Sequence, residues 1–143
     1  MAYVADGVVT DDTAIRDLLI TNKTWAVVGL SSNMARPAWG VAGFLKGHDK
    51  TIVPVHPRAE SVHGERGYGM LEEIPFPVDV VDVFVNADLA GPVTAQAIAI
   101  GAKAIWYQLG VVNEDAIKLA VEAGLQVVVD RCPAIEWPRL IGA

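Results

Sequence analysis

The sequence predicts an α/β protein, a doubly wound three-layer sandwich in which helices cover both faces of a five-stranded parallel sheet. Five apolar runs without polar alternation recur along the chain, as expected for strands buried on both faces. Segments with apolar residues at helical spacing separate these runs, so the elements form β-α-β units with right-handed crossovers. Hydrophobic residues make up 52% of the 143 residues, and there is no internal repeat or linker, so we expect one Rossmann-like domain over residues 1–143.

Capping and turn residues delimit the expected elements. Pro37 at a first-turn position and Gly47 as the stop bound one helix. Pro92 and Gly101 bound the next helix in the same way, and Asn113 caps the one after it. The expected strands cover residues 24–30, 50–57, 78–87, 104–111 and 126–133. The expected helices cover residues 14–22, 37–47, 91–103 and 113–125, with a short one within 67–77 and a mostly irregular tail at 134–143.

A common strand order for such a sheet, 3-2-1-4-5, predicts where a ligand binds. Ligands lie outside the carboxyl ends of the strands, at the point where the strand order reverses, here between the first and fourth strands. This order places the loop at 29–33 opposite residues 108–110. Pro54 leaves the second strand one donor short, which predicts strain or a neighbouring bulge. We expect Asp79 and Asp82 at or near the edge or end of the third strand.

The loop in VVGLSSNMARPAWG (residues 27–40) has the features of an anion site. A helix N-terminus leaves backbone N–H groups unpaired and carries partial positive charge, and a phosphate satisfies both. Gly29 allows the tight turn, Arg36 adds a permanent charge with a planar fork, and Pro37 presets the helix. Small side chains that can donate without crowding an anion follow the glycine: Ser31, Ser32 and Asn33. The alternative is an ordinary turn in which Ser32 or Asn33 is merely an N-cap.

Two features narrow the choice of nucleotide. The dinucleotide fingerprint G-x-G-x-x-G is absent, which weakens the case for NAD but leaves phosphate binding intact. An NAD-binding domain usually has an acidic residue after the second strand, whereas this chain has VHPR at 55–58. Arg58 and His56 there suit a phosphorylated ribose. The expected ligand is therefore coenzyme A with its 3′-phosphate, or NADP with its 2′-phosphate.

Five segments taken together carry a family resemblance: VVGLSSNMARPAWGVAGFL, IVPVHPR, VDVVDVFVNA, AIGAKAIWYQLGVVNEDA and AGLQVVVDRCPAIE. They lie in this order over roughly residues 24–136, so they cover most of the chain. In this combination the chain resembles the small CoA-binding proteins of Rossmann-like fold. Their nucleotide domain is similar to the CoA-binding domain of the succinyl-CoA synthetase alpha subunit.

The resemblance implies that CoA lies across the strand ends. Its diphosphate would contact the loop at 29–33, its adenine end would lie near Pro57 and Arg58, and its pantetheine arm would pass residues 86 and 108–110. The residues implied in binding are Gly29, Leu30, Ser31, Ser32, Asn33, Arg36, Pro37, His56, Pro57, Arg58, Asn86, Gln108, Leu109 and Gly110. The chain departs from the family pattern at His56, where PVNP has asparagine, and at Ala38, where serine is common after Arg-Pro.

The composition excludes several classes of partner. The net charge of −6 argues against a general nucleic-acid or anionic-membrane binder, and no apolar window approaches the ~18 residues of a membrane span. Between Lys23 and Arg66, six basic residues accompany three acidic ones, which suits a small anionic ligand, although chance clustering accounts for it equally well. We read no signal peptide, and a single cysteine fits a reducing compartment, so we expect a cytoplasmic protein.

No catalytic constellation stands out in the sequence. The three histidines, eight and seven residues apart, suit no zinc motif. Cys132 in DRCP follows a strand end, where a buried, inert thiol is the favoured interpretation and a mixed disulfide with CoA is a hypothesis. Asp130 and Arg131 beside it are expected to form an ion pair with each other.

These observations predict a CoA- or acyl-CoA-binding protein without catalytic machinery of its own. It would be a carrier, a sensor or a partner of an acyl-CoA enzyme, and a homodimer is plausible. Two alternatives stay open. One is a fragment of an NADP-dependent oxidoreductase, and the other is the nucleotide-binding subunit of an acyl-CoA ligase that acts in trans.

Overall fold

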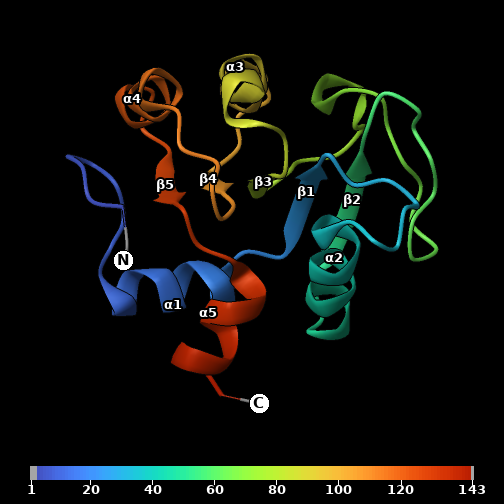
Figure 1. Cartoon of the computed structure of the whole chain (residues 1–143), viewed down its shortest axis with the longest axis horizontal. Coiled ribbons are helices and arrows are strands. Elements are labelled where there is room, and N and C mark those ends of the chain that lie inside the picture. Colours follow the sequence, from blue (N-terminus) through green and yellow to red (C-terminus); the bar gives the residue numbers. More distant parts are fainter. Residues whose placement is uncertain (1–2, 143) are drawn as a thin grey trace.

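The computed structural model describes residues 3–142 and consists of a five-stranded parallel sheet between two layers of helices (Figure 1). Helices α1, α2 and α5 cover one face, and α3 and α4 cover the other. The strands are β1 (Thr24–Val28), β2 (Thr51–Val55), β3 (Val80–Val83), β4 (Ala104–Tyr107) and β5 (Gln126–Val129). The helices are α1 (Asp12–Thr21), α2 (Pro37–Gly47), α3 (Ala90–Ala99), α4 (Glu114–Glu122) and α5 (Pro133–Leu140), with 3₁₀ turns η1 (Leu71–Glu73) and η2 (Ala87–Leu89). The predicted fold class is confirmed.

The strand order is β2-β1-β3-β4-β5, which differs from the expected 3-2-1-4-5 in the position of β3. This strand lies between β1 and β4 instead of outside β2. Asp79, just before β3, explains the pairing, because its carboxylate accepts hydrogen bonds from the N–H groups of Lys23 and Thr24 at the start of β1, at 3.1 and 3.0 Å. The order reverses between β1 and β3, so the crossover crevice lies there and not between β1 and β4.

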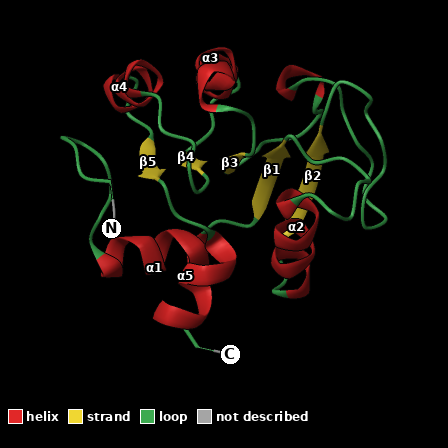
Figure 2. Cartoon of the chain, in the orientation of Figure 1, coloured by secondary structure: helices red, strands yellow, loops and turns green. Residues whose placement is uncertain are grey.

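β2 is therefore an edge strand, and this position accommodates Pro54. Its missing N–H lies on the side away from β1, where only an isolated bridge between Val55 and Tyr68 forms, so neither the expected strain nor a bulge is needed. Pro54 stays in register with Val27 of β1, and its carbonyl accepts from the N–H of Tyr68 at 2.9 Å. The chain after β2 runs as a long loop beside this edge (Figure 2).

Local capping explains where the helices begin. The side chain of Asp11 accepts from the N–H of Ala14 at the start of α1, and Asn113 does the same for Ala116 at the start of α4, both at 3.0 Å. The tail expected to be irregular forms α5 instead. Pro133 occupies its first turn, where a proline is favoured, and the helix continues through Pro138.

The core has two halves because both faces of the sheet are covered. Side chains of alternate strand residues pack against α3 and α4 on one face and against α1, α2 and α5 on the other. Asp82 is the exception to the apolar pattern. It was expected near an edge or end of its strand, but it lies within the central strand β3, between Val27 and Trp106, and is fully buried.

Candidate ligand-binding cavity

A cavity of about 910 Å³ lies along the carboxyl ends of the strands. Residues that follow each of the five strands line it, from His56 after β2, through Gly29 after β1, Asn86 after β3 and Gln108 after β4, to Cys132 after β5. Its size is within the range of small-molecule sites, and its position outside the strand ends is where doubly wound folds bind ligands.

Gly29 makes the turn at the end of β1. Its φ of +100° is a conformation that side chains rarely allow, and its N–H donates to the carbonyl of Val55 at 2.8 Å. A Cβ at this position would lie 2.7 Å from the carbonyl oxygen of Phe84 in the neighbouring chain after β3. The close approach of these two backbone segments at the crossover therefore requires glycine.

The loop after Gly29 uses its acceptors internally. The Ser31 hydroxyl accepts from the N–H of Asn33 at 3.2 Å, and the Asn33 side-chain oxygen accepts from the N–H of Ala35 at 3.0 Å. The hydroxyl hydrogen of Ser31 and the amide hydrogens of Asn33 have no acceptor within the described residues. Both residues line the cavity, so the groups left over for a ligand are donors, as an anion requires.

The N-terminus of α2 opens onto the same cavity. Arg36 is its N-cap residue and makes no side-chain capping bond, and the first turn contains no acidic residue. Within the described part of the chain, the Arg36 guanidinium forms no ion pair, and both it and Pro37 line the cavity. The positive end of the helix and a fixed cation thus lie together, and the carboxylate bound to this loop, that of Glu60, contacts Ser32 and not Arg36.

The second cationic group lies after β2. His56, Pro57 and Arg58 line the cavity, and the His56 Nδ1 atom accepts from the N–H of Arg58 at 3.2 Å. This contact places the proton of a neutral His56 on Nε2, from which it can donate to a ligand. The exposed guanidinium of Arg58 lies 3.7 Å from the carboxylate of Glu60.

Glu60 binds Ser32, a residue of the loop that was expected to contact the ligand. Its carboxylate accepts from the hydroxyl of Ser32 at 2.9 Å and from the N–H of Ser32 at 3.4 Å, and these hydrogen bonds lower the pKa of Glu60. Ser32 does not line the cavity, and neither does Leu30, whose side chain is buried in the core against α2. The other twelve residues implied in binding do line it.

The third group of predicted residues follows β3 and β4. Asn86, Gln108, Leu109 and Gly110 line the cavity, although the residue opposite Gly29 is Phe84 rather than one of residues 108–110. Gln108 is buried, and its side-chain oxygen has no hydrogen-bond partner within the described residues. A buried amide oxygen without a donor is costly, so it is available to a ligand N–H.

The apolar part of the lining was not predicted from the sequence. Six such residues come from the end of β3, the start of α3, the loop before η1 and the turn after β4: Met70, Phe84, Leu89, Pro92, Val93 and Val111. A signal existed for Pro92, because a predicted helix start just beyond a strand end faces the ligand crevice in this fold class. Met70 had no such signal, since it reaches the cavity from a long loop.

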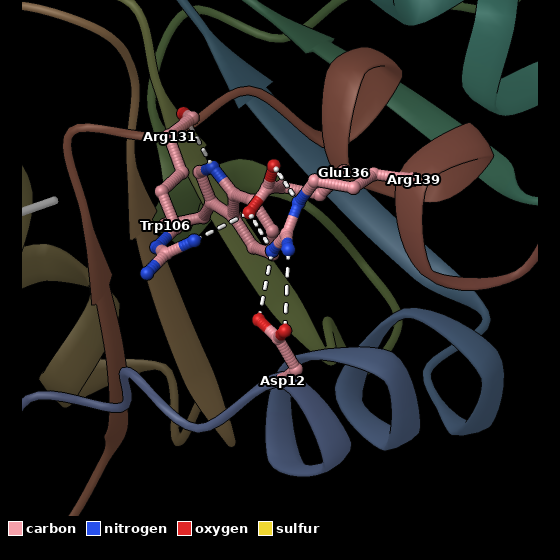
Figure 3. A network of polar contacts seen from close by, with 5 residues as sticks. All are labelled: Asp12, Trp106, Arg131, Glu136 and Arg139. Atoms are coloured by element: carbon pink, nitrogen blue, oxygen red, sulfur yellow. Dashed lines mark hydrogen bonds and ion pairs between the residues drawn. The ribbon is translucent and has the colours of Figure 1, made fainter. Parts of the chain in front are cut away.

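A polar network of five residues holds the segment between β5 and α5 (Figure 3). The indole of Trp106 donates to the carbonyl of Arg131 at 2.8 Å, and Arg131 pairs with Glu136 at 2.5 Å. Arg139 joins Glu136 to Asp12 on α1. The expected ion pair between Asp130 and Arg131 is absent from these contacts; Asp130 accepts from the N–H of Gly110 at 2.8 Å instead.

Within residues 3–142, no group of three or more His, Cys, Asp or Glu side chains is placed so that it could hold a metal ion. No helix in that range is long and apolar enough to cross a membrane.

Comparisons with known proteins agree with this geometry. YneT, an uncharacterized protein of Bacillus subtilis (strain 168), is 32% identical over 118 residues, which are 82% of this chain and 87% of YneT. A hypothetical protein from Pyrococcus horikoshii OT3 superposes with a TM-score of 0.92 at 37% identity, over 99% of this chain and 100% of that one. Acetyl-coenzyme A synthetase 1 of Ca. Korarchaeum cryptofilum shares the fold, with a TM-score of 0.63 at 22% identity over 73% of this chain and 25% of that one. A family model described as "CoA binding domain" matches residues 23–138. The predicted resemblance is confirmed, and this chain belongs to the CoA-binding domain family.

Proposed function

We propose that this protein binds coenzyme A or an acyl-CoA in the strand-end cavity and has no catalytic machinery of its own. The observation that carries the proposal is the set of unused hydrogen-bond donors in the β1–α2 loop. The acceptors of Ser31 and Asn33 are used within the loop, while their donors and the guanidinium of Arg36 lie at the start of α2. A diphosphate supplies what that arrangement lacks.

The order of the strands predicts which end of the ligand lies in which half of the cavity. The cationic Arg36 and Arg58 and the imidazole of His56 belong to the β1 and β2 half of the cavity, where a diphosphate and a ribose 3′-phosphate would bind. The β3 and β4 half contributes amide side chains, Asn86 and Gln108, among apolar residues. A pantetheine arm has the same alternation of amides and short apolar links, so it matches that half.

Calorimetric titration tests the proposal. CoA is expected to bind more tightly than NAD or NADP, and Arg36→Ala is expected to weaken CoA binding about tenfold or more, as the loss of a charge-assisted contact of ~1.5–3 kcal/mol predicts. Arg16→Ala on α1 is the matched control, since that exposed arginine lies outside the cavity and its loss should leave the affinity unchanged. Equal affinities for CoA and NADP, or equal effects of the two substitutions, would contradict the proposal.

The role of Arg58 has its own test. Dephospho-CoA lacks the 3′-phosphate, so it should bind more weakly than CoA to the native protein and about equally to Arg58→Ala. If the native protein does not distinguish the two nucleotides, Arg58 does not contact that phosphate.

The physiological role within this proposal is that of a cytoplasmic carrier, sensor or partner of an acyl-CoA enzyme. The likeness to an acetyl-CoA synthetase, of which this chain matches about a quarter, favours one alternative, a nucleotide-binding subunit that completes a ligase in trans. Recovery of a larger ligase partner on affinity purification would support that alternative. A homodimer without such a partner, measured by light scattering, would favour the stand-alone binding protein. A fluorescence change of NADPH on mixing would instead support the oxidoreductase alternative.

A further inference from the structure

We propose that Cys132 is a thiol–disulfide exchange site for CoA disulfide bound in the cavity. The inference rests on the proposed function and adds a reaction to it, the formation of a mixed disulfide between Cys132 and CoA.

The position of Cys132 is the first support. It is the chain's single cysteine, it follows β5, and it lines the same cavity as the cationic loop although little of its surface is exposed. Its sulfur makes no hydrogen bond within the described residues, so no protein group competes for it. Cys132 is also the N-cap residue of α5, so it lies at the end of the helix where backbone N–H groups lack intrahelical partners.

The contacts around Cys132 hold its backbone in place. Arg131, the residue before it, is fixed through its carbonyl by the Trp106 indole and through its side chain by Glu136 (Figure 3). Residue 133 is a proline at the start of α5, which restricts the backbone on the other side. The thiol is therefore presented to the cavity from a rigid segment.

A second, independent observation points to the ligand beside this thiol. Gln108 lines the cavity, is about 5% exposed, and its side-chain oxygen is buried without a partner among the described residues. It follows β4, the neighbour of β5, and Tyr107 just before it pairs with Val129 at the end of β5. An amide N–H of a pantetheine arm satisfies this oxygen, and a ligand held there directs its sulfur end toward the β5 side, where Cys132 lies.

The exchange balances without any further reagent. The Cys132 thiol loses its proton to water, and its sulfur attacks one sulfur of CoA disulfide. A new S–S bond forms between Cys132 and one CoA while the original S–S bond breaks, and the second CoA leaves as a thiolate that takes up a proton. The Cys132 sulfur is oxidised and the released CoA sulfur is reduced.

Denaturing intact-mass spectrometry after incubation with CoA disulfide tests the proposal. The expected result is a mass gain of one CoA less two hydrogens, removed by dithiothreitol and absent in Cys132→Ser. Glutathione disulfide at the same concentration is the control for simple thiol reactivity and should react at least tenfold more slowly. Desulfo-CoA, which has no thiol, should slow the reaction with CoA disulfide by occupying the cavity.

Calorimetry of Cys132→Ser and Cys132→Ala with reduced CoA separates this inference from the proposed function. If these variants and the native protein bind CoA but the native protein gains no mass, the exchange proposal fails and the binding proposal stands. If the adduct forms equally fast with glutathione disulfide and desulfo-CoA does not slow it, the thiol is merely accessible, and the exchange proposal fails as well. If native protein does not bind CoA, both proposals fail.

Discussion

Asp82 lies fully buried in the central strand, and both of its carboxylate oxygens lack a hydrogen-bond partner among the described residues. Burial without compensation disfavours the charged form, so the pKa of Asp82 is raised well above its ordinary value. In the unfolded chain the same carboxyl has an ordinary pKa of about 3.9. Folding above that pH therefore requires the carboxyl to take up a proton.

The sign of the effect follows from this difference. Between about pH 4 and the raised native pKa, the folded protein binds one more proton than the unfolded chain, so the contribution of Asp82 to stability falls as pH rises. The slope is about 1.4 kcal/mol per pH unit for one proton. Asp82→Asn removes the titration. Its amide adds an unpaired buried donor that costs about 1–3 kcal/mol, but that cost does not depend on pH.

Urea unfolding at pH 5, 6 and 7 and constant ionic strength measures the effect, with the fluorescence of the buried Trp25 and Trp106 as the signal. As pH rises, the unfolding free energy of Asp82→Asn relative to that of the native protein should increase by about 1.4 kcal/mol per pH unit, until the pH exceeds the pKa of Asp82 in the folded state. Parallel profiles of the two proteins over this range would refute the reasoning, because they would mean that Asp82 is ionised in the folded state.

Asp79, three residues earlier, is the matched control. Burial alone would raise its pKa, but hydrogen bonds from the N–H groups of Thr24 and Lys23 outweigh burial and leave the pKa lowered. Both its folded and unfolded forms are therefore ionised from pH 5 to 7. Asp79→Asn should destabilise the protein by an amount that does not change over this range.

Three further substitutions test other parts of the structure. Gly29→Ala should lower the melting temperature and weaken CoA binding more than Gly110→Ala. Both glycines adopt a positive φ, which costs a side chain ~1–2 kcal/mol, but only the added Cβ at position 29 would collide with neighbouring backbone. Equal effects of the two substitutions would contradict the close approach of the backbone segments at Gly29. Glu60→Gln should tighten CoA binding several-fold, because it removes a negative charge beside the cationic loop. Calorimetry measures the change against the control Glu65→Gln, whose partner Lys46 lies outside the cavity. Equal CoA affinities of these two variants would count against a phosphate at Arg58. Glu136→Gln should cost about 3 kcal/mol at pH 7 because it leaves two arginines without their buried partner. Burial opposes ionisation of Glu136, but hydrogen bonds from these arginines lower its pKa. The difference in unfolding free energy between the native protein and Glu136→Gln should therefore shrink as pH falls below about 4.3. A difference that stays constant would contradict the pairing.

The sequence was sufficient to predict the fold class and twelve of the residues that line the cavity, for a physical reason. Unbroken apolar runs identify strands buried on both faces, and the carboxyl ends of such strands meet at one edge of the sheet. Residues that follow different strands, such as Gly29, Arg58 and Gln108, therefore come together however the strands are ordered.

The strand order was harder to predict, although Pro54 carried a usable signal. A proline inside a strand argues for an edge position, which the observed order gives β2 and the expected order did not. The hydrogen bonds that the Asp79 carboxylate accepts, which hold β3 beside β1, join residues 55 and 56 positions apart, and no local pattern predicts them. The helical tail was missed for a related reason, since contacts of Glu136 with residues outside the tail help to hold it.

Ser32 and Leu30 show the limit of carrying a motif over residue by residue. Both belong to the loop sequence, but the loop turns Leu30 into the core and Ser32 toward Glu60, 28 residues later. Which side chains of a loop reach the cavity depends on backbone direction and on long-range partners, and a sequence pattern records neither.

A crystal structure of the protein with CoA tests the central claim most directly. The account predicts density for the diphosphate against Ser31, Asn33 and the start of the Pro37 helix, with the pantetheine arm leading past Gln108. Density for CoA elsewhere on the surface, or the β1–α2 loop unchanged and empty at saturating CoA, would contradict it.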